Sequence, residues 1–138
     1  MNYLFNDNIQ TVQACEFPSI ITPNTLELRD AYSQWNFIKQ LEDNWDGYGA
    51  VTPSVSTSWN VLALIHKLQA YLKSSPFLFP NPHGTISIEV EGRNNVIIEF
   101  EVGIDEGHFY IKGEEVMKWG YMNTNAEEDL PSTVKKFL

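Results

Sequence analysis

Apolar and polar residues alternate in two neighbouring runs, Ile86-Ser87-Ile88-Glu89-Val90-Glu91 and Val96-Ile97-Ile98-Glu99-Phe100-Glu101-Val102. Successive side chains of a strand point to opposite faces of a sheet, so this period of two predicts strands with one apolar and one polar face. The residues between the runs, Gly92 to Asn95, are rich in Gly and Asn and favour a tight turn. The two runs therefore predict an antiparallel hairpin.

Weaker alternation extends the hairpin toward the C-terminus. A turn at 103–107 leads to a third predicted strand at 108–112, in which Phe109 and Ile111 face inward. Residues 116–122 predict a fourth strand. Together these segments predict a sheet over residues 84–122.

N-terminal to the sheet, apolar residues recur at helical spacing. Asn24 and Glu27 form a capping box, and the stripe that follows predicts a helix over 25–43. Thr52 and Pro53 are a cap and first-turn pair that predicts the start of a second helix. The stripe of the first helix consists of Leu28, Tyr32, Trp35, Ile38, Leu41 and Trp45.

These elements predict one α+β domain over residues 1–138. A two-helix hairpin over 24–75 packs on one face of a three- to four-stranded antiparallel meander. An irregular arm over 1–23 precedes the hairpin, and a short terminal helix over 129–138 follows the sheet.

Composition places the chain among globular proteins. Of its 138 residues 43% are hydrophobic, and the lone Cys15 excludes an internal disulfide. The sequence contains neither a run of 18 apolar residues nor a basic-then-apolar N-terminus, which predicts a cytoplasmic protein without a membrane span.

Negative charge is concentrated in the second half of the chain. The net charge is −9, and residues 89–129 contain eleven carboxylates against three basic residues. Binding to nucleic acid requires a basic face, so this charge argues against a direct nucleic-acid partner. It favours instead a negative surface that attracts a basic protein.

A dense turn motif, Trp45-Asp46-Gly47-Tyr48-Gly49-Ala50, lies between the predicted helices. Its acidic spacing matches the first half of an EF-hand, but the position of the obligatory glutamate holds Pro53. A phosphate cradle would need a preceding strand and a third glycine, which the motif lacks. We therefore expect a structural turn, in which Trp45 anchors the first helix, Asp46 caps local amides, and Gly47 and Gly49 permit the reversal.

This motif resembles the Trp-Asp-Gly-x-Gly-Ala box of a family of small, functionally uncharacterised bacterial and phage-borne proteins. The resemblance spans roughly residues 35–102 and includes Pro53, the following helix, and Gly84 before an alternating strand. Members often have a Trp near the end of the first strand, where this chain has Val90. The resemblance implies one domain and no particular function.

The predicted sheet offers the best candidate site. Alternation puts the glutamates on one face of neighbouring strands, with His108, Tyr110 and Lys112 on the next strand. Such a face is a solvated surface, a docking surface for a cationic partner, or a metal or catalytic site. The glutamates are Glu89, Glu91, Glu99 and Glu101.

No nucleophilic triad, zinc spacing or cofactor motif is evident in the sequence. We therefore predict a non-enzymatic, acidic protein-binding module without cofactor or bound metal. It would act as an inhibitor of the antitoxin, immunity or phage anti-defence type, on a basic toxin, nuclease or other nucleic-acid-binding protein. One alternative is a metal-dependent hydrolase that uses the glutamates with His108. Another is a scaffold that self-associates into a homodimer through the outer strand near Trp119.

Overall fold

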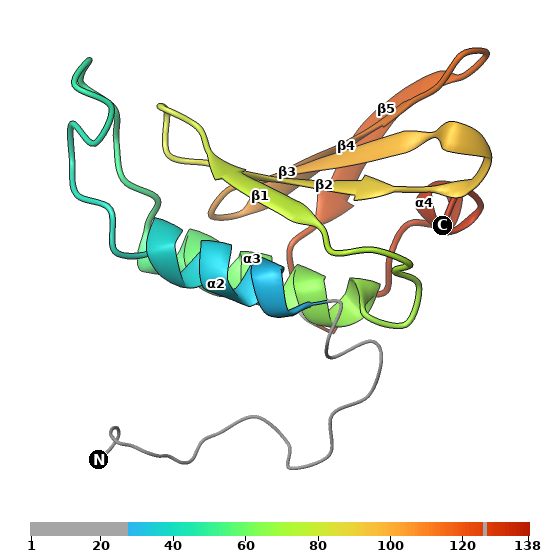
Figure 1. The fold of residues 1–138 in the computed structure, drawn as a ribbon, viewed down its shortest axis with the longest axis horizontal. Coiled ribbons are helices and arrows are strands. Elements are labelled where there is room, and N and C mark those ends of the chain that lie inside the picture. The colour runs from blue at the N-terminus through green and yellow to red at the C-terminus, as the bar shows by residue number, and fades with distance from the viewer. Residues whose placement is uncertain (1–27, 126) are drawn as a thin grey trace, which may run out of the picture.

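The computed structural model describes residues 28–125 and 127–138, and it confirms the α+β class (Figure 1). The strands form a single antiparallel sheet of five strands in the order β1-β2-β3-β4-β5. The predicted arm and the predicted helix cap at Asn24 lie outside the described residues. The elements are α2 (Arg29–Ile38), α3 (Val55–Leu68), β1 (Phe77–Pro80), β2 (Ile86–Glu91), the 3-10 turn η1 (Arg93–Asn95), β3 (Ile97–Val102), β4 (Glu106–Lys112), β5 (Met117–Asn123) and α4 (Ser132–Lys135).

The predicted strands appear as β2 to β5, and each pairs with its neighbour in sequence. The sheet of the described residues has five strands, where three or four were predicted. The additional strand is β1, whose sequence Phe77-Leu78-Phe79-Pro80 lies among prolines and carries no alternating pattern. Proline cannot donate to a sheet ladder and is tolerated at an edge, which is where β1 lies.

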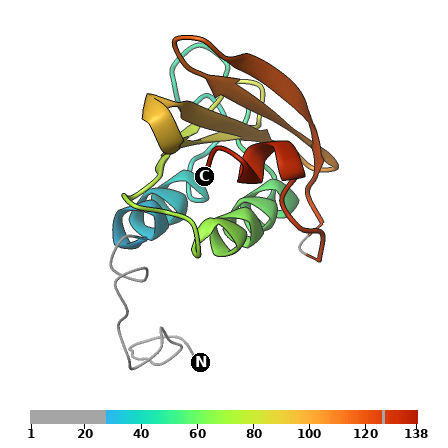
Figure 2. The same ribbon diagram turned by 90° about the vertical axis from the view of Figure 1, so that its right-hand side faces the viewer.

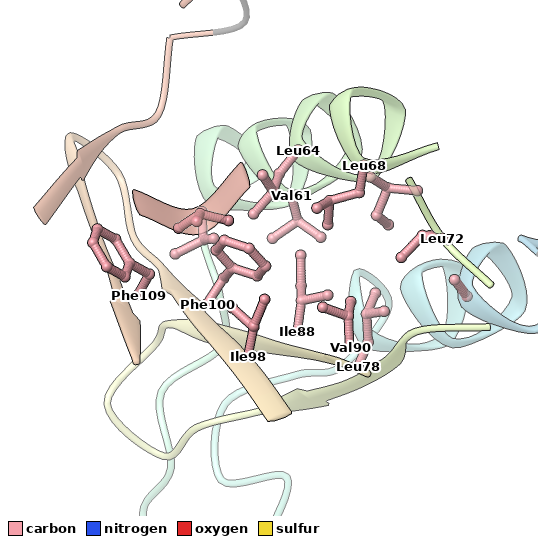
Figure 3. Packing of buried hydrophobic residues seen from close by; sticks show 14 of the residues in the cluster. Val61, Leu64, Leu68, Leu72, Leu78, Ile88, Val90, Ile98, Phe100 and Phe109 are labelled. Carbon is pink, nitrogen blue, oxygen red and sulfur yellow. The ribbon is translucent and has the colours of Figure 1, made fainter. Parts of the chain in front are cut away.

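Both helices cover the same face of the sheet, and the apolar side chains of the strands point toward them (Figures 1 and 3). Val61, Leu64 and Leu68 of α3 face Ile88 and Phe100 of the sheet, and all five side chains are buried. Burial of apolar surface contributes roughly 25 cal/mol per Å². This core fixes which face of each strand points inward, and therefore which residues remain on the other face.

Helix α2 is shorter than the predicted helix over 25–43, because it ends at Ile38. The next turn closes with the shorter 3-10 pattern, in which Leu41 N–H donates to the Ile38 carbonyl at 3.1 Å. Leu41 still packs against the core from outside the helix, so its helical spacing was misleading. The indole N–H of Trp35 reaches the Ser58 carbonyl at 2.7 Å and ties α2 to α3.

Helix α3 begins later than predicted, because its N-cap is Ser54 and not Thr52. The Ser54 hydroxyl accepts a hydrogen bond from the Thr57 N–H at 3.0 Å, which satisfies one of the unpaired amides of the first turn. The helix ends at Leu68, short of residue 75, where the predicted helical hairpin ends. The predicted hairpin over 24–75 is therefore two helices joined by a long loop, residues 39–54.

The predicted terminal helix over 129–138 is present as the single turn of α4, on the same side of the sheet as the other helices (Figure 2). Val134 and Leu138 are buried in the core. The Phe137 carbonyl accepts a hydrogen bond from the Arg93 N–H at 2.6 Å, which joins this segment to the turn between β2 and β3.

Candidate functional site

The sheet face turned away from the helices, here called the open face, holds the predicted glutamates in its middle strands. The strand register places Glu89 directly opposite Glu99, with Phe77 of β1 on the other side of Glu89. Glu99 in turn lies opposite Tyr110, and Tyr110 lies opposite Trp119. This row crosses all five strands, with aromatic residues at both ends and two carboxylates between them.

A second row runs parallel to the first across the open face. Ser87 lies opposite Phe79 on one side and Glu101 on the other, and Glu101 is followed by His108 and Tyr121. Glu91 lies nearer one end of the face, opposite Ile97, and its carboxylate accepts a hydrogen bond from Ser74 Oγ at 3.3 Å.

The predicted placement of the site residues is therefore confirmed. The four glutamates and Tyr110 share the face opposite the helices, as the alternation required. The aromatic residues of β1 on this face were not predicted, because β1 itself was not recognised.

Both hydrogen bonds of Glu101 meet at one carboxylate oxygen. Its Oε2 accepts hydrogen bonds from Thr85 Oγ1 at 2.7 Å and pairs with His83 Nε2 at 2.8 Å. Burial raises the pKa of Glu101. The hydrogen bonds from His83 and Thr85, with the charges of His83 and His108, outweigh burial and leave that pKa below its usual value. Glu101 is therefore held in its carboxylate form. It is paired with His83 and lies opposite His108 in the strand register.

Glu99 and Glu89 differ in their partners although they lie side by side. Glu99 Oε1 is 3.2 Å from Lys112 Nζ, and its other oxygen accepts a hydrogen bond from Ser87 Oγ at 3.4 Å. Lys112 Nζ also lies over the Tyr110 ring, 5.9 Å from its centroid. Glu89 is partly buried and has no cationic partner among the described residues.

An aromatic cluster covers the open face over β4 and β5. The rings of His108 and Tyr121 lie 4.9 Å apart, and those of Trp119 and Tyr121 lie 5.5 Å apart at an interplanar angle of 74°. Trp119 is 60% exposed and Tyr121 is 67% exposed. Exposed aromatic side chains of this size are frequent anchors of protein interfaces.

The turn motif folds as a hydrogen-bonded loop, as predicted, and its residues have structural contacts. Asp46 Oδ1 accepts hydrogen bonds from the Tyr48 N–H at 2.8 Å and the Ala50 N–H at 3.1 Å. Gly47 and Gly49 have φ of +80° and +88°, which glycine adopts without strain. The Trp45 indole donates to the Val51 carbonyl at 3.3 Å, so Trp45 anchors the loop itself and not the end of α2.

The same loop connects to the open face through the turn between β1 and β2. It rises past this turn at one end of the sheet (Figure 1). The Val51 N–H donates to the Pro82 carbonyl at 2.7 Å, and the next residue, His83, contacts Glu101. No sequence pattern indicated this link, because it joins residues far apart in the chain through a backbone carbonyl.

The carboxylates of the open face do not converge on a common point. In the described part of the chain, no group of three or more His, Cys, Asp or Glu side chains is arranged to hold a metal ion. None of the described helices has the length and apolar character of a membrane span.

These features define an acidic sheet face bordered by aromatic side chains. Comparisons with family models, curated proteins and solved structures found no match to this chain.

Proposed function

We propose that the protein is a non-enzymatic binding module whose open face docks on a basic surface of another protein. The observation that carries the proposal is the unequal pairing of neighbouring carboxylates. Glu99 pairs with Lys112 and Glu101 with the His83 imidazole, whereas the carboxylate of Glu89 between Phe77 and Glu99 has no such partner among the described residues. A basic side chain from a partner would complete this pattern.

Lys112 illustrates how such a cation would be held. Its ammonium group contacts the Glu99 carboxylate and lies over the Tyr110 ring, so charge and aromatic surface act on it together. The Glu89 carboxylate has an equivalent aromatic neighbour in Phe77, which is 54% exposed. An arginine or lysine of the partner would take the same kind of position beside Glu89.

The net charge of −9 supports a partner that normally binds nucleic acid, such as a toxin or nuclease. The arginines and lysines of that partner would meet the glutamates in place of phosphates, so binding would occlude the nucleic-acid site. Long-range attraction between the two surfaces would speed association and weaken as salt is added. This is the action of an inhibitor of the antitoxin, immunity or phage anti-defence type.

The test compares two variants that lose the same number of charges. In the first, Glu89, Glu91, Glu99 and Glu101 are changed to Gln. In the matched control, the exposed residues Glu114, Glu115, Glu127 and Glu128, which lie outside the strands of the sheet, are changed to Gln. Basic proteins captured from host lysate by the wild type are purified, and their affinity for all three forms is measured at two salt concentrations.

We expect the open-face variant to lose affinity by about tenfold or more, equivalent to roughly 1.4 kcal/mol. The control should lose far less, and circular dichroism should be the same for all three proteins. Equal affinity of the open-face variant and the wild type would contradict the proposal. So would equal losses in both variants, because net charge alone would then explain binding.

A further inference from the structure

We infer that the protein also forms a two-fold homodimer, in which β5 pairs antiparallel with β5 of a second copy. This inference does not depend on the proposed docking function. β5 is an outer strand of seven residues, and it pairs only with β4 among the described residues. An outer strand of this length presents a row of backbone N–H and C=O groups that another strand can pair with.

The opposite edge of the sheet is closed. β1 has four residues and ends in Pro80, which has no N–H to donate. The Leu78 N–H is occupied by Gln34 Oε1 of α2 at 2.6 Å. A molecule with one open edge and one closed edge forms a closed dimer through strand pairing and does not extend into a filament.

The side chains of β5 suit contact with a second copy of this acidic chain. Residues 117–123 contain no carboxylate, although 89–129 contain eleven. Strand pairing at β5 therefore brings no negative side chains of the two strands together. A basic segment would pair poorly with β5, because its positive charges would meet Lys118 across the new strand pair.

The order of residues in β5 is self-complementary. Gly120 is the middle residue of the seven, so a two-fold axis there pairs the whole strand with its copy. Trp119 then lies opposite Tyr121 of the second copy, and each dimer contains this aromatic pair twice. A side chain at position 120 is excluded by the fold itself, because its Cβ would lie 2.7 Å from Phe109 Cζ.

The dimer is tested by measuring molar mass with multi-angle light scattering over a range of concentration and salt. We expect the mass to rise toward twice that of the monomer with concentration. Added salt should strengthen the dimer, because it screens the repulsion between two chains of charge −9. Binding of a basic partner responds to salt in the opposite direction, so failure of one proposal is distinguishable from failure of the other.

Two variants locate the interface. Trp119→Glu places negative charge on β5 of both copies and should weaken the dimer by about tenfold or more. Phe77→Glu adds the same charge to an exposed aromatic position on the closed edge and should leave the dimer unchanged. Circular dichroism of each variant checks that the monomer is folded.

A mixing experiment tests the register. Tyr121→Lys alone should also form a weaker dimer than the wild type, because of like charges near the axis. An equimolar mixture of Trp119→Glu and Tyr121→Lys should form a heterodimer, because the new Glu and Lys then lie opposite each other. A monomer at all concentrations and salts would overturn the inference. A dimer sensitive to Phe77→Glu and not to Trp119→Glu would also overturn it, and absence of heterodimer rescue would exclude the axis at Gly120.

Discussion

The glutamates of the open face differ in how far neighbouring groups of the chain offset their negative charge. Glu101 is compensated by two hydrogen bonds and nearby imidazoles, and Glu99 by Lys112. Glu89 stands opposite Glu99 and has no cationic partner in the described part of the chain. Directly opposed like charges in a sheet are about 5 Å apart and destabilise it. Glu89 therefore costs the folded protein free energy, which agrees with the binding role proposed for it.

Changing Glu89 to Gln should stabilise the protein. The variant removes a like-charge pair and keeps the size of the side chain, so we expect a gain of about 0.5 kcal/mol at low salt in urea unfolding. The gain should shrink at high salt, where the repulsion is screened. Glu91→Gln is the control, because Glu91 is exposed and lies opposite Ile97, and it should change stability little. A loss of stability on Glu89→Gln would contradict the assigned repulsion.

The sequence was enough to predict which glutamates share the open face, but not which groups they form hydrogen bonds with. Alternation alone places Glu89, Glu99 and Glu101 on one face, since a one-residue shift would bury them all. Which of them is paired depends on His83, which reaches Glu101 from the turn between β1 and β2. No local pattern encodes that contact, because it is set by how the turn is folded against the sheet.

Among the elements, the bounds of β2 and β3 were predicted more accurately than the ends of the helices, although β1 was not predicted at all. The period of two in β2 and β3 survives in the structure because both strands have one buried and one accessible face along most of their length. The helical period around Leu41 and Trp45 continued beyond the true end of α2. Apolar residues of a loop can meet the same core as a helix, so their spacing does not show where the helix ends.

The N-cap of α3 gives a test of the observed boundary. Ser54→Ala removes the acceptor of the Thr57 N–H and should cost about 1 kcal/mol in the free energy of unfolding. Ser56→Ala is the matched control, because Ser56 is exposed within the first turn of the same helix. Chemical denaturation of both variants measures the difference. Similar stability of the two would show that Ser54 does not cap the helix.

At the scale of the whole molecule, the C-terminal segment closes the space between the helices and one end of the sheet (Figure 2). Leu130, Val134 and Leu138 enter the core, and the Phe137 carbonyl bonds to Arg93 of the β2–β3 turn. A Cβ on Gly92 would overlap that carbonyl, so only glycine allows this close approach.

Gly92→Ala should therefore destabilise the protein, by about 1–3 kcal/mol, because the backbone at Phe137 must move. Gly103→Ala is the control: its Cβ would meet neighbouring atoms at 3.4 and 3.6 Å, which is close to ordinary contact. Thermal unfolding of both variants gives the comparison. Equal melting temperatures for Gly92→Ala and the wild type would show that the terminal segment does not constrain the turn.

The order of elements along the chain has a consequence for synthesis. Each strand pairs with the next across connections at 81–85, 92–96, 103–105 and 113–116, so the sheet closes only short loops as it forms. The helices come first, however, and the apolar side chains of α3 find their partners only when the strands have followed. A nascent chain that has exposed residues 28–68 alone therefore presents an uncovered apolar helix pair, which is the stage at which a chaperone would bind it.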